Sequence, residues 1–168
     1  LRLRGFGPDD FETYARWCGD AETMRFIGEG KPVGRDDAWR SLAVVMGHWP
    51  LRGYGLWAAE EKASGALIGR IGLYEPAGWP GLEVGWLVDR ERWGEGFAPE
   101  GAAAALHHAF TVLSVARLIS LIQPDNAPSI RVAEKLGERY DGQIEVSGAV
   151  ANVYAIGRET WRSTVSSP

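Results

Sequence analysis

A strand, a glycine turn and an alanine-rich helix follow one another in the middle of the chain, and this order constrains the fold more than any other feature of the sequence. The run from about Leu82 to Val88 predicts a strand, and Gly94 and Gly96 predict a turn after it. Apolar residues at helical spacing predict a helix from about Ala98 to Leu113, and the short run Leu118–Ile122 is typical of a buried strand. A strand–helix–strand step of this kind favours a parallel strand pair.

The segments before and after this step predict antiparallel strands and further helices. Strands are predicted at Leu1–Arg4, Leu56–Glu60, Ala66–Tyr74, Gln143–Val146 and Val150–Ile156, and helices beginning at Pro8, at Ala21, near Asp36 (to about Met46) and at Asn126 (to about Leu136). The predicted fold class is therefore α/β (α+β), with a mixed, mostly antiparallel sheet that contains one parallel pair and is flanked by helices. No linker or repeat divides the 168 residues, so we expect one domain over residues 1–168.

Composition excludes several classes of protein. The net charge of −4 argues against a nucleic-acid-binding surface. The single cysteine, Cys18, forms no internal disulfide and provides no thiolate cluster for a structural zinc. The charge-free stretch Gly101–Ala116 is shorter than the ~20 apolar residues of a membrane span. We expect a soluble, cytoplasmic protein with no metal, no nucleic acid and no membrane among its partners.

The glycine turn carries the first functional signal. The amides of a turn and of the first helical residues have no intrahelical acceptors, so a helix start of this kind is a site for phosphate or pyrophosphate. A strand-to-helix turn without a ligand is the alternative. The third glycine of a dinucleotide fingerprint is absent after Gly94 and Gly96, and no Gly-Lys-Ser/Thr follows as in a P-loop.

The second signal lies between Asn126 and Gly137. Asn126 is a good N-cap, Pro128 fits the first turn of a helix, and Gly137 is typical of its C-terminal end. Capping alone accounts for Asn126, and Ser129 is equally a polar residue of the first turn.

Together these segments resemble the GNAT superfamily of acetyl-CoA-dependent N-acetyltransferases. Trp93–Glu100 (W-G-E-G-F-A-P-E) resembles the W-G-x-G-Y-A-x-E of its ribosomal-protein-alanine acetyltransferase branch, the RimJ/RimL type. Asn126–Ser129 and Glu134–Gly137 resemble the N-x-x-S and E-K-L-G of the same branch. The likeness covers nearly the whole chain in the right order.

The resemblance implies a GNAT fold and acetyl-CoA as co-substrate. The backbone amides that it assigns to the pyrophosphate belong to Trp93, Gly94, Glu95, Gly96, Phe97 and Ala98. The strand end at Leu87 and Val88 splays from its parallel neighbour and pairs with the pantetheine arm, which Asn126 helps to hold.

The chemistry requires a base for the attacking amine and a donor for the departing thiolate. Glu83 lies five residues before Val88, where the branch commonly places an acid, and it is the candidate base, acting through water; an exposed glutamate or an ion-pair partner is the alternative. Many members carry a tyrosine seven residues after the asparagine, but here that residue is Ala133. Ser129 is the branch's alternative donor.

Histidine and tryptophan residues are interpreted as structural. His107 and His108 lie in the middle of a predicted helix, away from the predicted site. Trp49, Trp57 and Trp79 are candidates for the wall of an acceptor pocket, although packing accounts for each of them.

The predicted function is the transfer of an acetyl group from acetyl-CoA to a primary amine by direct attack in a ternary complex. The acceptor classes are a protein or peptide N-terminus, a polyamine and an aminoglycoside-like amine, and the acidic balance of the chain favours a cationic one. We expect a monomer or a homodimer. A non-catalytic acyl-CoA-binding module with the same fold is the rival reading.

Overall fold

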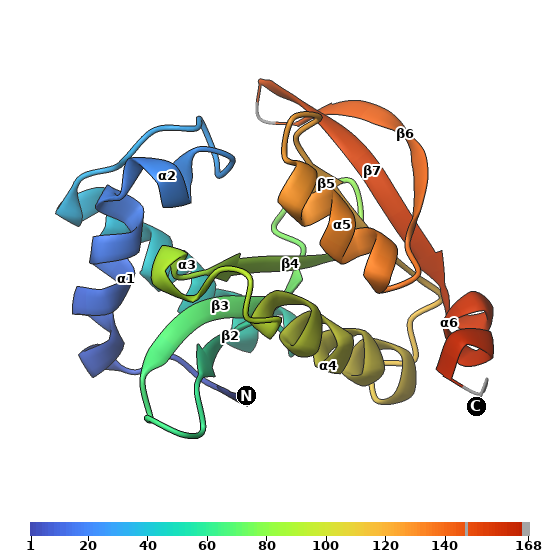
Figure 1. Ribbon diagram of the computed structural model, residues 1–168, viewed down its shortest axis with the longest axis horizontal. Helices are drawn as coiled ribbons and strands as arrows, with labels where there is room; N and C mark the ends of the chain where they lie inside the picture. Colours follow the sequence, from blue (N-terminus) through green and yellow to red (C-terminus); the bar gives the residue numbers. More distant parts are fainter. Residues whose placement is uncertain (147, 166–168) are drawn as a thin grey trace.

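The structure is a computed structural model that describes residues 1–146 and 148–165. Within these residues one sheet has the strand order β1-β2-β3-β4-β5-β7-β6 (Figure 1). Its strands are β1 (Arg2–Arg4), β2 (Leu56–Glu60), β3 (Leu67–Tyr74), β4 (Glu83–Val88), β5 (Arg117–Ile122), β6 (Arg139–Val146) and β7 (Ala149–Gly157). The helices are α1 (Phe11–Gly19), α2 (Ala21–Met24), α3 (Arg35–Arg52), α4 (Phe97–Thr111), α5 (Ala127–Lys135) and α6 (Arg158–Val165).

The fold class predicted from the sequence is confirmed. Every neighbouring pair of strands is antiparallel except β4 and β5, which are parallel. The predicted domain, residues 1–168, includes Ser147 and residues 166–168, which lie outside the described part of the chain.

The largest differences from the prediction are the end of α3, the start of β6 and one further helix. Helix α3 runs to Arg52 instead of Met46. Pro50 lies near its end and removes one backbone hydrogen bond without ending the helix, which stops where Gly53, at φ +78°, provides the left-handed C-cap. Strand β6 begins at Arg139, ahead of an irregularity between Tyr140 and Gln143 that hides its periodicity. Helix α6 was not predicted at all.

Helices cover both faces of the sheet. Against one face lies α4, whose Ala102, Ala105 and Ala109 are fully buried, as their spacing predicts. The helix approaches β3 so closely that a Cβ on Gly101 would lie 2.5 Å from the Ile71 side chain. The opposite face packs against α1 and α3 through a cluster of buried residues: Tyr14, Trp17, Cys18, Ala38, Leu42 and Leu87.

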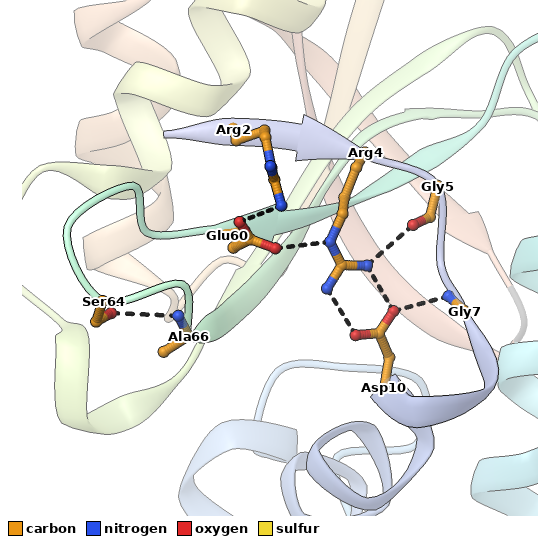
Figure 2. A network of polar contacts seen from close by, with 8 residues as sticks. All are labelled: Arg2, Arg4, Gly5, Gly7, Asp10, Glu60, Ser64 and Ala66. Atoms are coloured by element: carbon orange, nitrogen blue, oxygen red, sulfur yellow. Dashed lines mark hydrogen bonds and ion pairs between the residues drawn. The ribbon is translucent and has the colours of Figure 1, made fainter.

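A polar network fixes β1 against β2 and the start of α1 (Figure 2). Arg4 contacts both carboxylate oxygens of Asp10 at 2.7 and 2.8 Å, and its Nε donates to Glu60 at 2.8 Å. Asp10 also accepts from the Gly7 amide at 2.8 Å, and Arg2 pairs with Glu60 at 2.5 Å. Paired in this way, Asp10 and Glu60 are buried without an uncompensated charge.

The parallel pair in the middle of the sheet opens almost as soon as it forms. Strands β4 and β5 share a single paired position, Glu83 with Ile119, although each has six residues. The Ile119 amide donates to the Leu82 carbonyl at 3.0 Å at the same end. Beyond this point the two strands diverge, so the backbone of β4 toward Val88 faces a groove instead of a neighbouring strand.

Candidate active site

The turn after β4 presents a row of unpaired backbone amides. Gly94 and Gly96 have φ of +83° and +86°, a left-handed conformation that favours glycine, and Gly96 is the N-cap of α4. In the described chain no backbone hydrogen bond has its donor within residues 94–98. Open space surrounds the Cβ position of both glycines, with no other atom within 4 Å. Free amides, open space and the positive end of a helix together fit a phosphate or pyrophosphate group.

A groove of about 570 Å³ leads away from this turn. Its lining includes nine residues that the sequence assigns to the donor site: Leu87, Val88, Trp93, Gly94, Gly96, Phe97, Ala98, Asn126 and Ser129. The tenth, Glu95, does not line it, and its carboxylate lies 3.4 Å from Arg92 Nε. Arg25, Arg131 and Lys135 also line the groove and add positive charge. The residues present therefore fit a long donor with a phosphate-bearing end.

The start of α5 brings two candidate residues together. Asn126 Oδ1 accepts from the backbone N–H of Ser129 at 3.3 Å, so Asn126 is the side-chain N-cap that its position predicts. The Ser129 hydroxyl accepts from Trp86 Nε1 at 3.3 Å. Because that contact uses a lone pair on Oγ, the hydroxyl proton of Ser129 stays available to donate. Ala133, which replaces the tyrosine of other members, is fully buried and offers no donor.

A second pocket, of about 350 Å³, opens on the face of the sheet that α1 and α3 cover. The register pairs Tyr74 with Glu83, Gly72 with Gly85 and Arg70 with Leu87, so these side chains share one face. Gly85 carries no side chain and lines the pocket, which leaves a gap beside Glu83. Gly72 packs closely against β2, where an added Cβ would lie 2.7 Å from the Trp57 ring. The pocket is also lined by residues 26–28, which follow α2, and by Val146 and residues 149–151 of the β6–β7 hairpin.

Glu83 lies at the end of this pocket with a strongly shifted pKa. Desolvation by burial raises the pKa of its carboxyl to about 7. A hydrogen bond from Trp79 Nε1, at 2.7 Å, a bond to the Leu121 backbone and the charge of Arg70 act in the opposite direction. A Cβ added at Gly85 would lie 3.7 Å from Glu83 Oε1, so glycine keeps the side of that oxygen open. A carboxyl group with a pKa near neutrality and an open approach fits the role of a general base.

The groove and the pocket meet. Five residues line both cavities: Phe26, Ile27, Trp86, Asn126 and Ser129. A donor that extends along the groove from the glycine turn reaches Ser129, and an acceptor in the pocket lies between Ser129 and Glu83. Of the two candidate catalytic residues, Ser129 on α5 lines both cavities where they meet, and Glu83 on β4 lines the pocket alone.

A second buried carboxyl group lies behind the pocket wall. Glu138 is fully buried, and burial raises the pKa of its side chain to about 8. Its Oε1 lies 3.1 Å from the hydroxyl of Ser120, which lines the pocket and donates to the Val84 carbonyl at 2.8 Å. Among the described residues Oε2 has no hydrogen-bond partner. Burial therefore favours the protonated form of Glu138 at neutral pH, whereas the hydrogen bond that Ser120 donates to Oε1 acts in the opposite direction.

Sequence reasoning missed several pocket residues. Arg70 and Ser120 lie on strands whose alternation alone does not show which face opens into a cavity. Trp79, a candidate for the pocket wall with packing as the alternative, lines the pocket beside Glu83. Trp49 does pack: its ring lies 5.1 Å from Trp57, and its Nε1 donates to a backbone carbonyl. His48 is also structural, because its two ring nitrogens contact the Tyr54 carbonyl and the Glu75 amide.

Residues 1–146 and 148–165 contain no group of three or more His, Cys, Asp or Glu side chains arranged to hold a metal ion. In the same part of the chain, no helix combines the length and the hydrophobicity of a membrane span.

A splayed parallel pair, an anion-binding turn and a base-bearing pocket that meets the donor groove define an acyltransferase that uses a phosphate-bearing donor. The chain belongs to the GNAT acetyltransferase family: the family model for the acetyltransferase (GNAT) domain matches residues 1–139. It is an N-acetyltransferase, and its acyl donor is acetyl-CoA.

Relatives and solved structures agree with this assignment. The uncharacterized N-acetyltransferase YnaD of Bacillus subtilis is 29% identical over 167 residues, 96% of this chain and 95% of that protein. The uncharacterized protein YkkB of the same organism is 38% identical over 97 residues, 55% of this chain and 56% of YkkB.

Among solved structures, an acetyltransferase from Agrobacterium tumefaciens is 28% identical, with a TM-score of 0.82 over 93% of this chain and 92% of that one. The aminoglycoside acetyltransferase AAC(6')-Ib, in complex with ribostamycin and coenzyme A, is 18% identical, with a TM-score of 0.82 over 99% and 98% of the two chains, and it shares the fold.

Proposed function

We propose that the protein transfers the acetyl group directly from acetyl-CoA to a primary amine while both are bound. The observation that carries this proposal is the junction of the two cavities between Glu83 and Ser129. Direct transfer needs the donor and the acceptor side by side, and the junction of the two cavities supports that arrangement.

Each candidate residue has a defined role in the transfer. The amine attacks the thioester carbonyl, an N–C bond forms, and the C–S bond breaks with its electron pair on sulfur. Glu83, directly or through one water, accepts the proton that the amine loses. Ser129 donates to the departing thiolate; a hydroxyl is a weak acid, so hydrogen bonding to sulfur is its main contribution.

The donor is held by backbone more than by side chains. The free amides of residues 94–98 bind the pyrophosphate, and the exposed edge of β4 at Leu87 and Val88 pairs with the pantetheine arm. The Trp93 amide, which the sequence also assigns to the pyrophosphate, donates to the Arg90 carbonyl at 3.2 Å instead. Asn126 supports that arm, and Arg131 and Lys135 add charge near the phosphates. Because Ala133 stands where many members of the family have a tyrosine, Ser129 is the candidate hydrogen-bond donor at the junction of the two cavities.

The acceptor is an amine, and its class follows from the resemblance. The motifs at Trp93–Glu100 and Asn126–Ser129 support a place in the RimJ/RimL branch, for which a protein N-terminus is the acceptor. Likeness of fold to AAC(6')-Ib supports a small amine. Peptide N-termini, polyamines, aminoglycosides and amino acids are therefore the classes to test.

The proposal is tested by following the free CoA thiol and the mass of the amine with each class of acceptor. We expect thiol release only when an amine is present, in equal amount to the acetylated amine. Initial-rate lines that intersect when both substrates vary support the ternary complex, whereas parallel lines indicate a covalent acetyl-enzyme and contradict direct attack. CoA binding without thiol release from any amine indicates a non-catalytic binding module.

A further inference from the structure

Arg70 stands out among the residues that line the acceptor pocket. It lies on β3, half-buried, on the same face as Tyr74 and Glu83. Arg70 and Glu83 are the two charged residues among the described residues that line this pocket. The pocket therefore has one positive and one acidic side chain, whereas the chain as a whole has a net charge of −4.

The guanidinium of Arg70 has a neutral anchor. Its Nη1 donates to the Tyr14 hydroxyl at 2.9 Å, and its Cζ lies 5.6 Å from the centre of the Tyr14 ring. The Tyr14 hydroxyl also lies 2.9 Å from Ser41 Oγ. Tyr14 is 1% exposed and belongs to the core beneath α1 and α3. A buried tyrosine thus holds the guanidinium in place while leaving its charge uncompensated.

No carboxylate neutralises Arg70 within the described residues. None of their ion pairs includes it, whereas Arg4, Arg16 and Arg92 each lie within an ion pair. Glu83 lies close enough for the charge of Arg70 to lower its pKa, but burial keeps the pKa of Glu83 near 7, so the pocket lacks a permanent anion. A guanidinium has five N–H donors, and the bond to Tyr14 uses one of them.

We infer that Arg70 binds an anionic oxygen group, a carboxylate or a phosphate, on the acceptor amine. The inference deepens the proposed function, on which it rests, by naming the class of acceptor. Arg is the side chain best suited to planar, two-point binding of such groups. The amine of the same molecule lies toward Glu83, so the pocket takes a small zwitterion instead of a polycation.

The dimensions of the double row set the size of the acceptor. Arg70 and Tyr74 are four residues apart on β3, which places their Cα atoms roughly 13 Å apart. The arginine side chain is long, so the guanidinium can lie closer to Glu83 than the Cα atoms do. The remaining space suits a small molecule. Gly85 leaves the floor beside Glu83 open, and Trp79 and Phe26 provide apolar walls.

A matched panel of acceptors tests the inference. Each L-amino acid is compared with its amide, and phosphoethanolamine with ethanolamine, so that the carboxylate and phosphate arms are separate. Spermidine, kanamycin and a peptide without acidic side chains represent the other classes. The measured quantity is kcat/KM for thiol release, with fluorescence titration of the pocket tryptophans by the same compounds as a readout independent of activity.

The variants are Arg70→Gln, which removes the charge at similar length, and Tyr14→Phe, which removes the hydroxyl that holds the guanidinium. Arg40→Gln, which changes an exposed arginine on α3, is the control. We expect the wild type to prefer at least one anionic amine over its neutral partner by about 10- to 100-fold in kcat/KM. Arg70→Gln should abolish that preference through KM, Tyr14→Phe should weaken it, and Arg40→Gln should retain it.

The outcomes separate this inference from the proposed function. Turnover of amines with no preference for an anionic group, or a preference that survives in Arg70→Gln, overturns the role of Arg70 alone. Best turnover with spermidine or kanamycin overturns it as well. CoA binding with no thiol release from any compound overturns the proposed function, and this inference falls with it.

Discussion

Trp79 Nε1 donates a hydrogen bond of 2.7 Å to Oε2 of Glu83, the carboxyl group at the end of the acceptor pocket. Trp79 belongs to the loop between β3 and β4, and its ring also lies 5.5 Å from that of Tyr74 in an edge-to-face contact. The indole thus fixes one carboxylate oxygen while the gap at Gly85 keeps the side of the other open. It also favours the ionised form and limits the rise of the Glu83 pKa.

Trp79→Phe should therefore move the acidic limb of the pH–rate profile. The substitution keeps an aromatic ring but removes the donor, so the pKa of Glu83 rises further above 7. We expect the midpoint of the rise in kcat/KM to shift to higher pH. Trp49→Phe, which removes an indole hydrogen bond to the Leu56 carbonyl and none to Glu83, is the control and should leave the midpoint in place. A shift to lower pH would contradict this role of Trp79.

Gly96→Val should abolish CoA binding while leaving the fold intact. The space around Gly96 is open, so the cost comes from placing a β-branched residue at φ +86°, which moves the amides of the turn out of line. Wild type should show a higher Tm at saturating CoA, and the variant should not. Gly65→Val is the control, because Gly65 also has positive φ and open space but lies in the turn between β2 and β3. An unchanged CoA affinity in Gly96→Val would show that CoA binds elsewhere.

Ser129→Ala should lower kcat more than it weakens CoA binding. The hydroxyl lies at the junction of the two cavities and has its proton free to donate. Loss of one hydrogen bond to a charged group reduces the rate by roughly 10- to 100-fold. Steady-state kinetics and CoA titration measure the two effects separately. Equal losses would assign the hydroxyl to cofactor positioning, and turnover like that of the wild type would remove Ser129 from the mechanism.

Glu138→Gln should flatten the dependence of stability on pH. The folded protein holds the Glu138 proton up to a pKa of about 8, whereas an unfolded glutamate has a pKa near 4.3. Between these two pKa values the folded state binds more protons than the unfolded state. The free energy of unfolding therefore decreases by about 1.4 kcal/mol for each pH unit of rise. Glu83 contributes in the same direction up to about pH 7.

Thermal or urea unfolding from pH 5 to 9 checks this prediction. We expect the wild type to lose stability across the range, Glu138→Gln to lose much less, and Glu83→Gln/Glu138→Gln to lose least. Glutamine has nearly the same shape and keeps an oxygen that accepts from Ser120, so the core stays filled. An identical decline in wild type and Glu138→Gln would show that Glu138 is ionised in the folded protein.

Much of the fold can be predicted from periodicity, because most of its helices and strands have a clear local sequence pattern. The alanine stripe of α4 and the cap at Asn126 lie where the sequence predicts. The start of β6 could not be predicted from periodicity, because the irregularity between Tyr140 and Gln143 breaks the alternation by which a strand is recognised. Pro50 similarly obscures the end of α3.

The acceptor pocket was the part least predictable from the sequence. Glu83 was identified through its distance from the glycine turn, which is local information. Arg70 and Trp79 contribute through the register between β3 and β4 and through the path of the loop between them. Glu138 follows a helix C-terminus, where a charged residue is ordinarily solvent-exposed, and only the packed structure shows it fully buried.

The most direct test of the account is the pH dependence of kcat/KM for wild type and Glu83→Gln from pH 6 to 10, with the best amine found and with Glu12→Gln as an exposed control on α1. For the wild type we predict a rise through the Glu83 pKa of about 7. Glu83→Gln should lack that limb and be slower by ~10²–10⁴-fold at neutral pH, with the loss shrinking toward the pKa of the amine. A loss that is the same at every pH, or no loss at all, would contradict the role of Glu83 as the base.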